Sequence, residues 1–125
     1  YMVENLIIED FIKEWLEHFN LIFNQDIKIN SELSLSYHIP SLNIGVLIID
    51  WKRPISIQIV NKAIQILREL KLTTLYLISK EISDPAQKNL MKYGEGIIPI
   101  HPNGISEIAV DISIKLKFLE SQIIM

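Results

Sequence analysis

The chain has 125 residues, enough for one domain with a sizeable buried core. Its net charge of −3 argues against a histone-like or generally basic nucleic-acid binder, but it leaves room for a nuclease with an acidic metal site. No apolar run approaches the ~18 residues that span a bilayer, so we expect neither a membrane segment nor a signal peptide. The absence of cysteine excludes disulfides and agrees with the cytoplasmic location that we expect.

The first half of the chain predicts one helix followed by strands. Apolar residues at helical spacing predict an amphipathic helix over about 3–23, with a stop at 24–26. Alternating apolar residues predict strands at 26–29 and 32–39. In the second of these strands, four apolar side chains are expected to share one face: Leu33, Leu35, Tyr37 and Ile39.

A turn over 40–43 then leads into the most informative segment, the run over 44–49 that ends in Asp50-Trp51-Lys52-Arg53. The near-continuous apolar and β-branched character of the run predicts a strand buried on both faces. This strand and the one before it are expected to form an antiparallel hairpin.

The second half of the chain alternates between helical and extended patterns. The predicted elements are a helix over 56–70, a buried strand over 73–79, a helix over 84–93, a short edge strand over 96–100 and a helix over 105–121. The order α-β-β-β-α-β-α-β-α predicts a single α/β domain over residues 1–125. Its mixed sheet should have four to five strands, flanked by helices.

The register of the hairpin brings a third residue to the acid and base at its end. Asp50 and Lys52 point to the same side of their strand, ~7 Å apart. With the turn centred near Leu42, partner residue numbers sum to about 84, which places Asp50 opposite Ser34 and Lys52 opposite Glu32. Glu32, Asp50 and Lys52 then share one face of the sheet.

Two carboxylates and a lysine on one sheet face have a clear chemical use. Glu32 and Asp50 offer the oxygen ligands that Mg²⁺ takes, and a bound metal lowers the pKa of its water. Lys52 can orient the attacking water or stabilise the charge that develops on the phosphate. The alternative is structural: a cross-strand ion pair between Lys52 and Glu32, with Asp50 only ending a strand.

The segment from Ile44 to Gly104 resembles the restriction-endonuclease-like PD-(D/E)xK superfamily, in particular its Mrr-like branch. The resemblance is carried by the order of elements and by four short segments: 46–53, 75–80, 83–88 and 97–100. It implies an α-β-β-β-α-β core and a Mg²⁺-dependent endonuclease acting on DNA in repair, recombination or defence. By the same resemblance, Asp50 is the second metal-binding acid and Lys52 is the catalytic lysine.

The chain departs from this family at the strand before the motif. The family places an acid there, usually aspartate, whereas this chain has Ser36, Tyr37 and His38 in that neighbourhood. Glu32 is the only acid in the strand. A catalytically inactive module for DNA binding or protein assembly is therefore a second hypothesis. A third is a small doubly-wound ligand-sensing domain, which requires a largely parallel sheet.

Other residues have both functional and structural interpretations. His38 and His101 are candidate ligands or proton carriers, and Gln58 and Gln65 are candidate site residues on a helix. Cations that could contact phosphates are Arg53, Lys80, Lys88 and Lys92. For most of these side chains, simple solvation explains the pattern equally well.

The end of the last predicted helix is unusually apolar for a small acidic domain. Its apolar residues are Phe118, Leu119, Ile123, Ile124 and Met125. They predict an interface in a homodimer or with an assembly partner, or alternatively packing against the chain's own sheet.

Overall fold

The structure is a computed structural model that describes residues 2–28, 34–49 and 52–124. Its elements are α1 (Met2–His18), β1 (Asn24–Lys28), β2 (Ser34–Ile39), β3 (Ile44–Ile48), α2 (Ile57–Glu69), β4 (Thr74–Ile78), α3 (Asp84–Tyr93), β5 (Ile97–Ile100), a 3₁₀ turn (Pro102–Gly104) and α4 (Ser106–Ile124).

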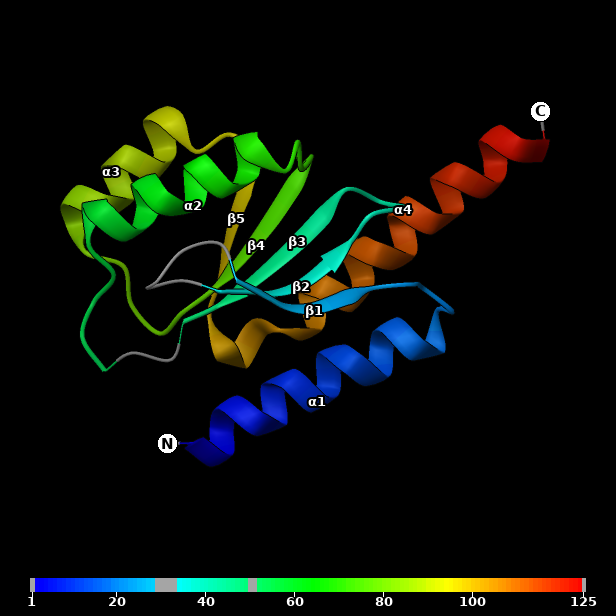
Figure 1. Cartoon of the computed structure of the whole chain (residues 1–125), viewed down its shortest axis with the longest axis horizontal. Coiled ribbons are helices and arrows are strands. Elements are labelled where there is room, and N and C mark those ends of the chain that lie inside the picture. Colours follow the sequence, from blue (N-terminus) through cyan, green and yellow to red (C-terminus); the bar gives the residue numbers. More distant parts are fainter. Residues whose placement is uncertain (1, 29–33, 50–51, 125) are drawn as a thin grey trace.

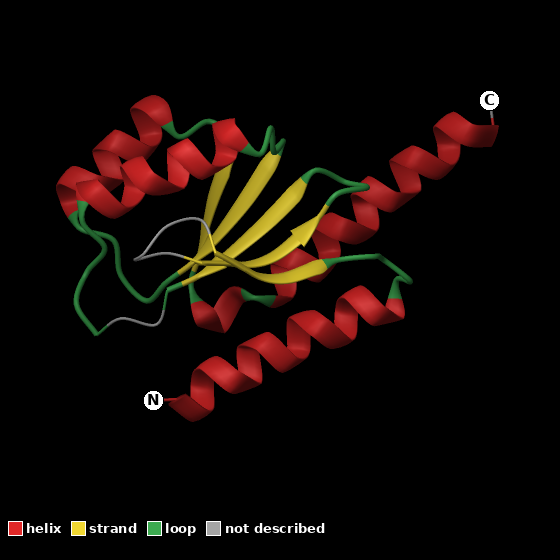
Figure 2. Ribbon diagram, viewed as in Figure 1, coloured by secondary structure: helices red, strands yellow, loops and turns green. Residues whose placement is uncertain are grey.

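The strands form one five-stranded sheet in the order β1-β2-β3-β4-β5. The first three strands pair antiparallel and the last three pair parallel, so the sheet is mixed. Helices α2 and α3 cover one face, whereas α1 and α4 cover the other (Figures 1 and 2). The predicted α/β architecture is confirmed, and the largely parallel sheet of a doubly-wound domain is not found.

Burial of the central strands on both faces explains their apolar sequences. Every residue of β4 is buried. Leu75 and Leu77 pack under α2, while Tyr76 and Ile78 contact the layer that contains α1 and α4. Two separate cores therefore meet at β3 and β4, each closed by its own pair of helices.

Helix α1 ends earlier than its apolar pattern predicts. The expected helix over 3–23 stops at His18, because Asn20 takes a left-handed backbone with φ of 57°. The N–H of Leu21 then reaches back to the carbonyl of Leu16 at 2.9 Å, which closes the helix by a Schellman-type cap. The predicted stop at 24–26 was wrong, since Asn24 already begins β1.

The β2–β3 hairpin is confirmed, but its predicted register was wrong by one residue. The observed partners are Tyr37 with Val46, His38 with Gly45, and Ile39 with Ile44. Their numbers sum to 83 instead of about 84, because the connecting turn has an even number of residues, 40–43. The pairings expected for Asp50 with Ser34 and for Lys52 with Glu32 thus lose their premise. Glu32 and Asp50 lie outside the described part of the chain.

A second departure occurs within β2, where the alternation of faces breaks. Leu35 packs in the core under α2, whereas Tyr37 and Ile39 pack in the core under α1 and α4. The regular ladder ends at Tyr37, and the side chain of Ser36 instead accepts the N–H of Ile48 at 3.2 Å. This bulge-like insertion shifts the following residue to the other face. The prediction of one shared face was therefore wrong for Leu35.

The second half of the chain follows its sequence signals closely. Ser83 caps α3 by accepting the N–H of Ala86, and the helix ends at Gly94. β5 is an edge strand. Proline has no N–H to donate, and an edge strand tolerates it because only one side of the strand is paired. In the part of the chain that the structure describes, no helix combines the length and apolar character needed to cross a membrane.

Gly45 lies where the core under α2 has no space for a side chain. A Cβ at this position would approach Leu72 Cδ1 to 2.7 Å and Leu75 Cδ1 to 3.0 Å, and Leu75 is fully buried. We expect Gly45→Ala to lower the free energy of unfolding by about 1–3 kcal/mol through overpacking, measured by urea denaturation.

Gly104→Ala is the matched control, because its Cβ would meet nothing closer than 3.9 Å. Equal stability of the two variants would contradict the packing described for Gly45.

Candidate functional site

The carboxyl ends of the parallel strands define one edge of the sheet, and the amino end of β2 lies at the same edge. Strands β3, β4 and β5 run parallel, while β2 runs antiparallel to β3. Ser34 therefore begins its strand where β3 ends. The start of β2 and the ends of β3, β4 and β5 thus lie along the same edge. Ligand sites of open α/β sheets commonly lie outside the carboxyl ends of strands.

Hydrogen bonds extend this edge beyond the strands themselves. The N–H of Ile49 donates to the carbonyl of Ile78 at 2.9 Å, and the N–H of Ser79 donates to that of Ile100 at 3.1 Å. Ser36, which is only 7% exposed, uses its hydroxyl to hold the N–H of Ile48. The strand ends are consequently fixed relative to one another.

The loops that follow β3 and β4 are also joined. Ile55 forms an isolated parallel bridge with Ile82: its N–H donates to the Glu81 carbonyl at 3.0 Å, and its carbonyl accepts the N–H of Ser83 at 3.0 Å. These loops carry three exposed cations, namely Lys52, Arg53 and Lys80. The same loops also carry the exposed acid Glu81, so charges of both signs lie on the backbone that this bridge joins.

Of the three residues predicted to form the site, the structure describes Lys52 alone. Lys52 is exposed in the loop after β3. Glu32 and Asp50 lie outside the described residues. Within the described part of the chain, no three histidine or acidic side chains converge as metal ligands.

The histidines considered above are placed away from this edge or are already engaged. His38 pairs with Gly45 near the start of β3, whereas Lys52 follows the end of that strand. His101 accepts the N–H of Asn103 through Nδ1 at 3.1 Å, which caps the 3₁₀ turn. We therefore interpret the two histidines as structural.

The remaining polar candidates lie on exposed helix surfaces. Gln65 donates to Glu69 Oε1 at 2.8 Å along its own helix, while Gln58 is exposed in the first turn of α2. Lys88 is exposed on α3, and the ammonium group of Lys92 lies 5.4 Å from the ring centre of Tyr93. Solvation and local contacts account for these side chains.

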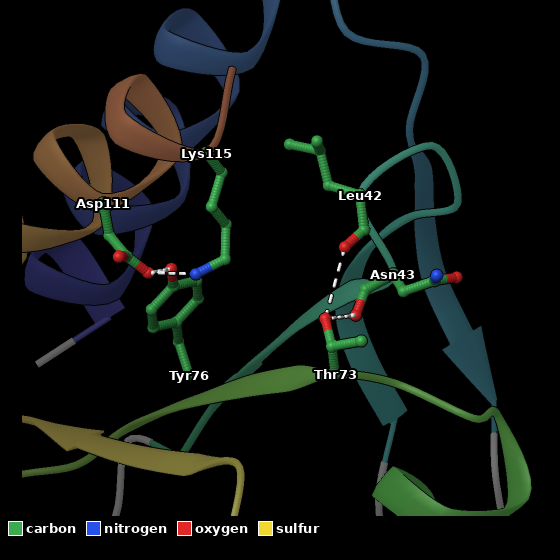
Figure 3. Close-up of polar contacts among 6 residues, drawn as sticks. All are labelled: Leu42, Asn43, Thr73, Tyr76, Asp111 and Lys115. Atoms are coloured by element: carbon green, nitrogen blue, oxygen red, sulfur yellow. Dashed lines mark hydrogen bonds and ion pairs between the residues drawn. The ribbon is translucent and has the colours of Figure 1, made fainter. Parts of the chain in front are cut away.

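A second polar cluster lies on the face of the sheet that α1 and α4 cover, and it was not predicted from the sequence. The hydroxyl of Tyr76 in β4 donates to Asp111 Oδ2 on α4, and Lys115 Nζ lies 2.9 Å from the same oxygen (Figure 3). The available signal was an acid and a base spaced four residues apart on a helix with many apolar residues. Their shared partner on a buried strand could not be inferred without the tertiary structure.

The electrostatics of this cluster follow from burial and hydrogen bonding. Burial raises the pKa of Tyr76, and the hydrogen bond to the Asp111 carboxylate and its negative charge raise it further. For Asp111, burial alone would raise the pKa, but the hydrogen bonds from Tyr76 and Lys115 and the charge of Lys115 outweigh that effect. The pKa of Asp111 is therefore lowered, and the cluster holds a carboxylate between two donors.

Nearby, the amino end of β4 is tied to the β2–β3 turn. The hydroxyl of Thr73 donates to the carbonyl of Asn43 at 3.2 Å, and it lies 3.4 Å from that of Leu42 (Figure 3). Polar contacts thus fasten β4 at its amino end, and the Tyr76 cluster fastens it to α4.

Comparison with family models, with curated proteins and with solved structures finds no match to this chain.

Removing the Tyr76 hydroxyl should separate the contribution of the hydrogen bond to Asp111 from the contribution of the buried ring. Because the ring remains, Tyr76→Phe should cost only the hydrogen bond to Asp111, about 1–2 kcal/mol of unfolding free energy. Chemical denaturation measures this loss. An unchanged midpoint would mean that the hydroxyl contributes nothing to the attachment of α4.

The stabilisation by Asp111 should depend on pH. Because its pKa is lowered in the folded state, the stabilisation is complete above the unfolded carboxyl pKa of ~3.9 and is lost as pH falls through the folded value. The stability difference between the wild type and Asp111→Asn should accordingly narrow below about pH 4. Asp10→Asn, on an exposed position of α1, serves as the control, and a difference that stays constant with pH would contradict this assignment.

Proposed function

We propose that the chain is a restriction-endonuclease-like domain that hydrolyses phosphodiester bonds of DNA at the edge where β2 begins and β3 and β4 end. Glu32 and Asp50 would hold Mg²⁺, and Lys52 would assist at the scissile phosphate. The observation that carries this proposal is the topology: an antiparallel β2–β3 hairpin followed by α2 and a parallel β4.

This order supports the proposal, because the strands that adjoin the three proposed residues in the sequence have their ends at one edge of the sheet. Glu32 precedes β2, Asp50 follows β3, and these two strand ends are neighbours in the sheet. Lys52 lies just beyond. This support does not depend on the side-chain register within the hairpin, which differs from the one predicted.

The donor set suits a hard divalent cation. Both proposed ligands are carboxylates, which Mg²⁺ prefers, and the sequence offers no thiolate to favour a softer metal. When bound, Mg²⁺ would lower the pKa of a coordinated water and neutralise charge on the phosphate.

The chain's own cations would act on the DNA directly. The Lys52 ammonium group would orient the attacking water or stabilise charge that develops on the phosphate oxygens. Arg53 and Lys80, exposed on the two joined loops, would contact neighbouring phosphates and hold the backbone in place. These three side chains would thereby bring positive charge to the DNA phosphates, while the net charge of the chain is negative.

A second candidate keeps the fold and the DNA contact but lacks hydrolysis. It is favoured by the sequence of β2, where Ser36, Tyr37 and His38 stand in the neighbourhood that carries an aspartate in the resembled family. The hydroxyl of Ser36 is already committed to the N–H of Ile48. In this case the chain would be a DNA-binding or assembly module.

Cleavage of single-stranded, duplex and branched DNA in the presence of Mg²⁺ tests the leading proposal. We expect Lys52→Ala and Asp50→Asn each to lower the cleavage rate by about 100-fold or more, since each removes a group that acts on the reacting phosphate. Lys13→Ala, on the exposed surface of α1, and Glu95→Gln, before β5, are the matched controls and should cleave normally.

The outcomes separate the two candidates. Equal cleavage by all variants would assign the activity to a contaminant and reject the proposed residues. DNA binding without cleavage by the wild type would instead favour the second candidate. In that case binding should weaken as salt is raised, as expected for contacts to phosphates.

A further inference from the structure

A cleft lies between α4 and the edge strand β5, on the face of the sheet that α1 and α4 cover. Its volume of about 380 Å³ is in the range of small-molecule sites. Because β5 has no neighbouring strand on its outer side, the sheet ends at this cleft, and the side chain of Ile98 is 39% exposed there. The cleft is therefore open to a ligand from solvent.

The walls of the cleft are mostly apolar. Ile98 and Ile100 form the strand side, and Val110 and Ile114 form the helix side. Val110 and Ile114 are 60% and 59% exposed, and their spacing of four residues places them one above the other on α4. These walls suit the aliphatic or aromatic body of a ligand.

The polar groups of the cleft are mostly hydrogen-bond acceptors. Tyr76 is only 1% exposed, and its hydroxyl donates its hydrogen to Asp111 Oδ2, so its oxygen can only accept from a further group (Figure 3). The ionised carboxylates of Asp111 and Glu107 likewise accept and cannot donate. Among the described residues that line the cleft, Ser106 alone has a side-chain hydrogen left to donate. The matching ligand must therefore bring the donors.

The cleft also has an uncompensated negative charge. None of the described residues that line it is a cation. Lys115 compensates Asp111 from outside this lining, with its Nζ at 2.9 Å from Oδ2. The Glu107 carboxylate, in contrast, makes no hydrogen bond or ion pair with another described residue. A cation with N–H donors would complement Glu107, whereas an anion would meet two carboxylates and few donors.

We infer that the cleft between α4 and β5 binds a small amphipathic amine. The protonated nitrogen of the amine donates to the Glu107 carboxylate, and its apolar body packs between Ile98 on β5 and Val110 on α4. Asp111 and the Tyr76 oxygen are further acceptors in the same cleft. This inference does not rest on the proposed nuclease function, because the proposed catalytic residues and the lining of this cleft are different residues.

Three probes with the same alkyl chain test the class of ligand, namely n-octylamine, 1-octanol and octanoate. Each is titrated into the isotope-labelled full chain, and the amide chemical shifts are followed by NMR. Octylamine should shift the amides of Ile98, Ile100 and residues 106–114, with a dissociation constant of about 1 mM. Octanol should bind about 5-fold more weakly, because it lacks the charge, and octanoate about 10-fold more weakly or less, because it is repelled.

Two substitutions test the role of the cleft residues. Glu107→Gln keeps the shape of the side chain and should weaken octylamine about 5-fold, as expected for an exposed ion pair, without affecting octanol. Its matched control is Glu120→Gln, at an exposed position of α4 outside the cleft. Val110→Lys places an ammonium group in the cleft and should weaken octylamine by about 10-fold or more. Met91→Lys, at an 82% exposed position of α3, is its control.

Circular dichroism and thermal melting would establish that the variants remain folded. Equal affinities for octylamine and octanol, or tighter binding of octanoate, would overturn the inference. So would an absence of shifts at the cleft with about 10 mM octylamine, or a Glu107→Gln variant that binds octylamine as tightly as the wild type.

Discussion

Burial of β3 and β4 on both faces is the constraint on which the rest of this structure depends. A strand with water on neither side must be apolar along its whole length, and two helical layers must close the two cores that it separates. Helices α2 and α3 close one core, and α1 and α4 close the other. The chain can meet this demand because two parallel crossovers follow an antiparallel hairpin. The same demand leaves polar chemistry only at strand ends and along helix surfaces.

The single ionisable group in the middle of β4 shows how strictly this demand applies. Tyr76 is 1% exposed, yet its hydroxyl reaches a carboxylate on α4. A buried hydroxyl without a hydrogen-bond partner would destabilise the fold. Asp111 accepts the hydrogen bond of Tyr76, and this bond also attaches α4 to the sheet. Lys115 in turn compensates the carboxylate. The position of α4 over the sheet is consequently set by polar as well as apolar contacts.

The sequence predicted the order of elements well, because each depends on local signals. The cap at Ser83, the stop at Gly94 and the edge position of Pro99 all follow from a residue's own backbone preferences. It predicted the end of α1 poorly, because the apolar residues after His18 continue a helical pattern while Asn20 reverses the chain. A left-handed asparagine is a weak signal in sequence, although it decides the geometry.

For the candidate site, the structure tests only the arrangement of the strands next to the predicted residues. The acid and base that follow β3 can be read from the sequence, and the topology confirms that the start of β2 lies beside that strand's end. The face on which each side chain lies could not be derived. It depends on the length of the 40–43 turn and on the hydrogen bond of Ser36, and each of these shifts the register by a single residue. The Tyr76 cluster was beyond prediction because its members are brought together only by the packing of α4.

The bridge between Ile55 and Ile82 has a mechanical consequence. It ties the two loops at the carboxyl edge together at one point, where the N–H of Ile55 donates to Glu81 and its carbonyl accepts from Ser83. The loops after β3 and β4 therefore share one backbone anchor, at residues 55 and 81–83, beyond the ends of the strands themselves.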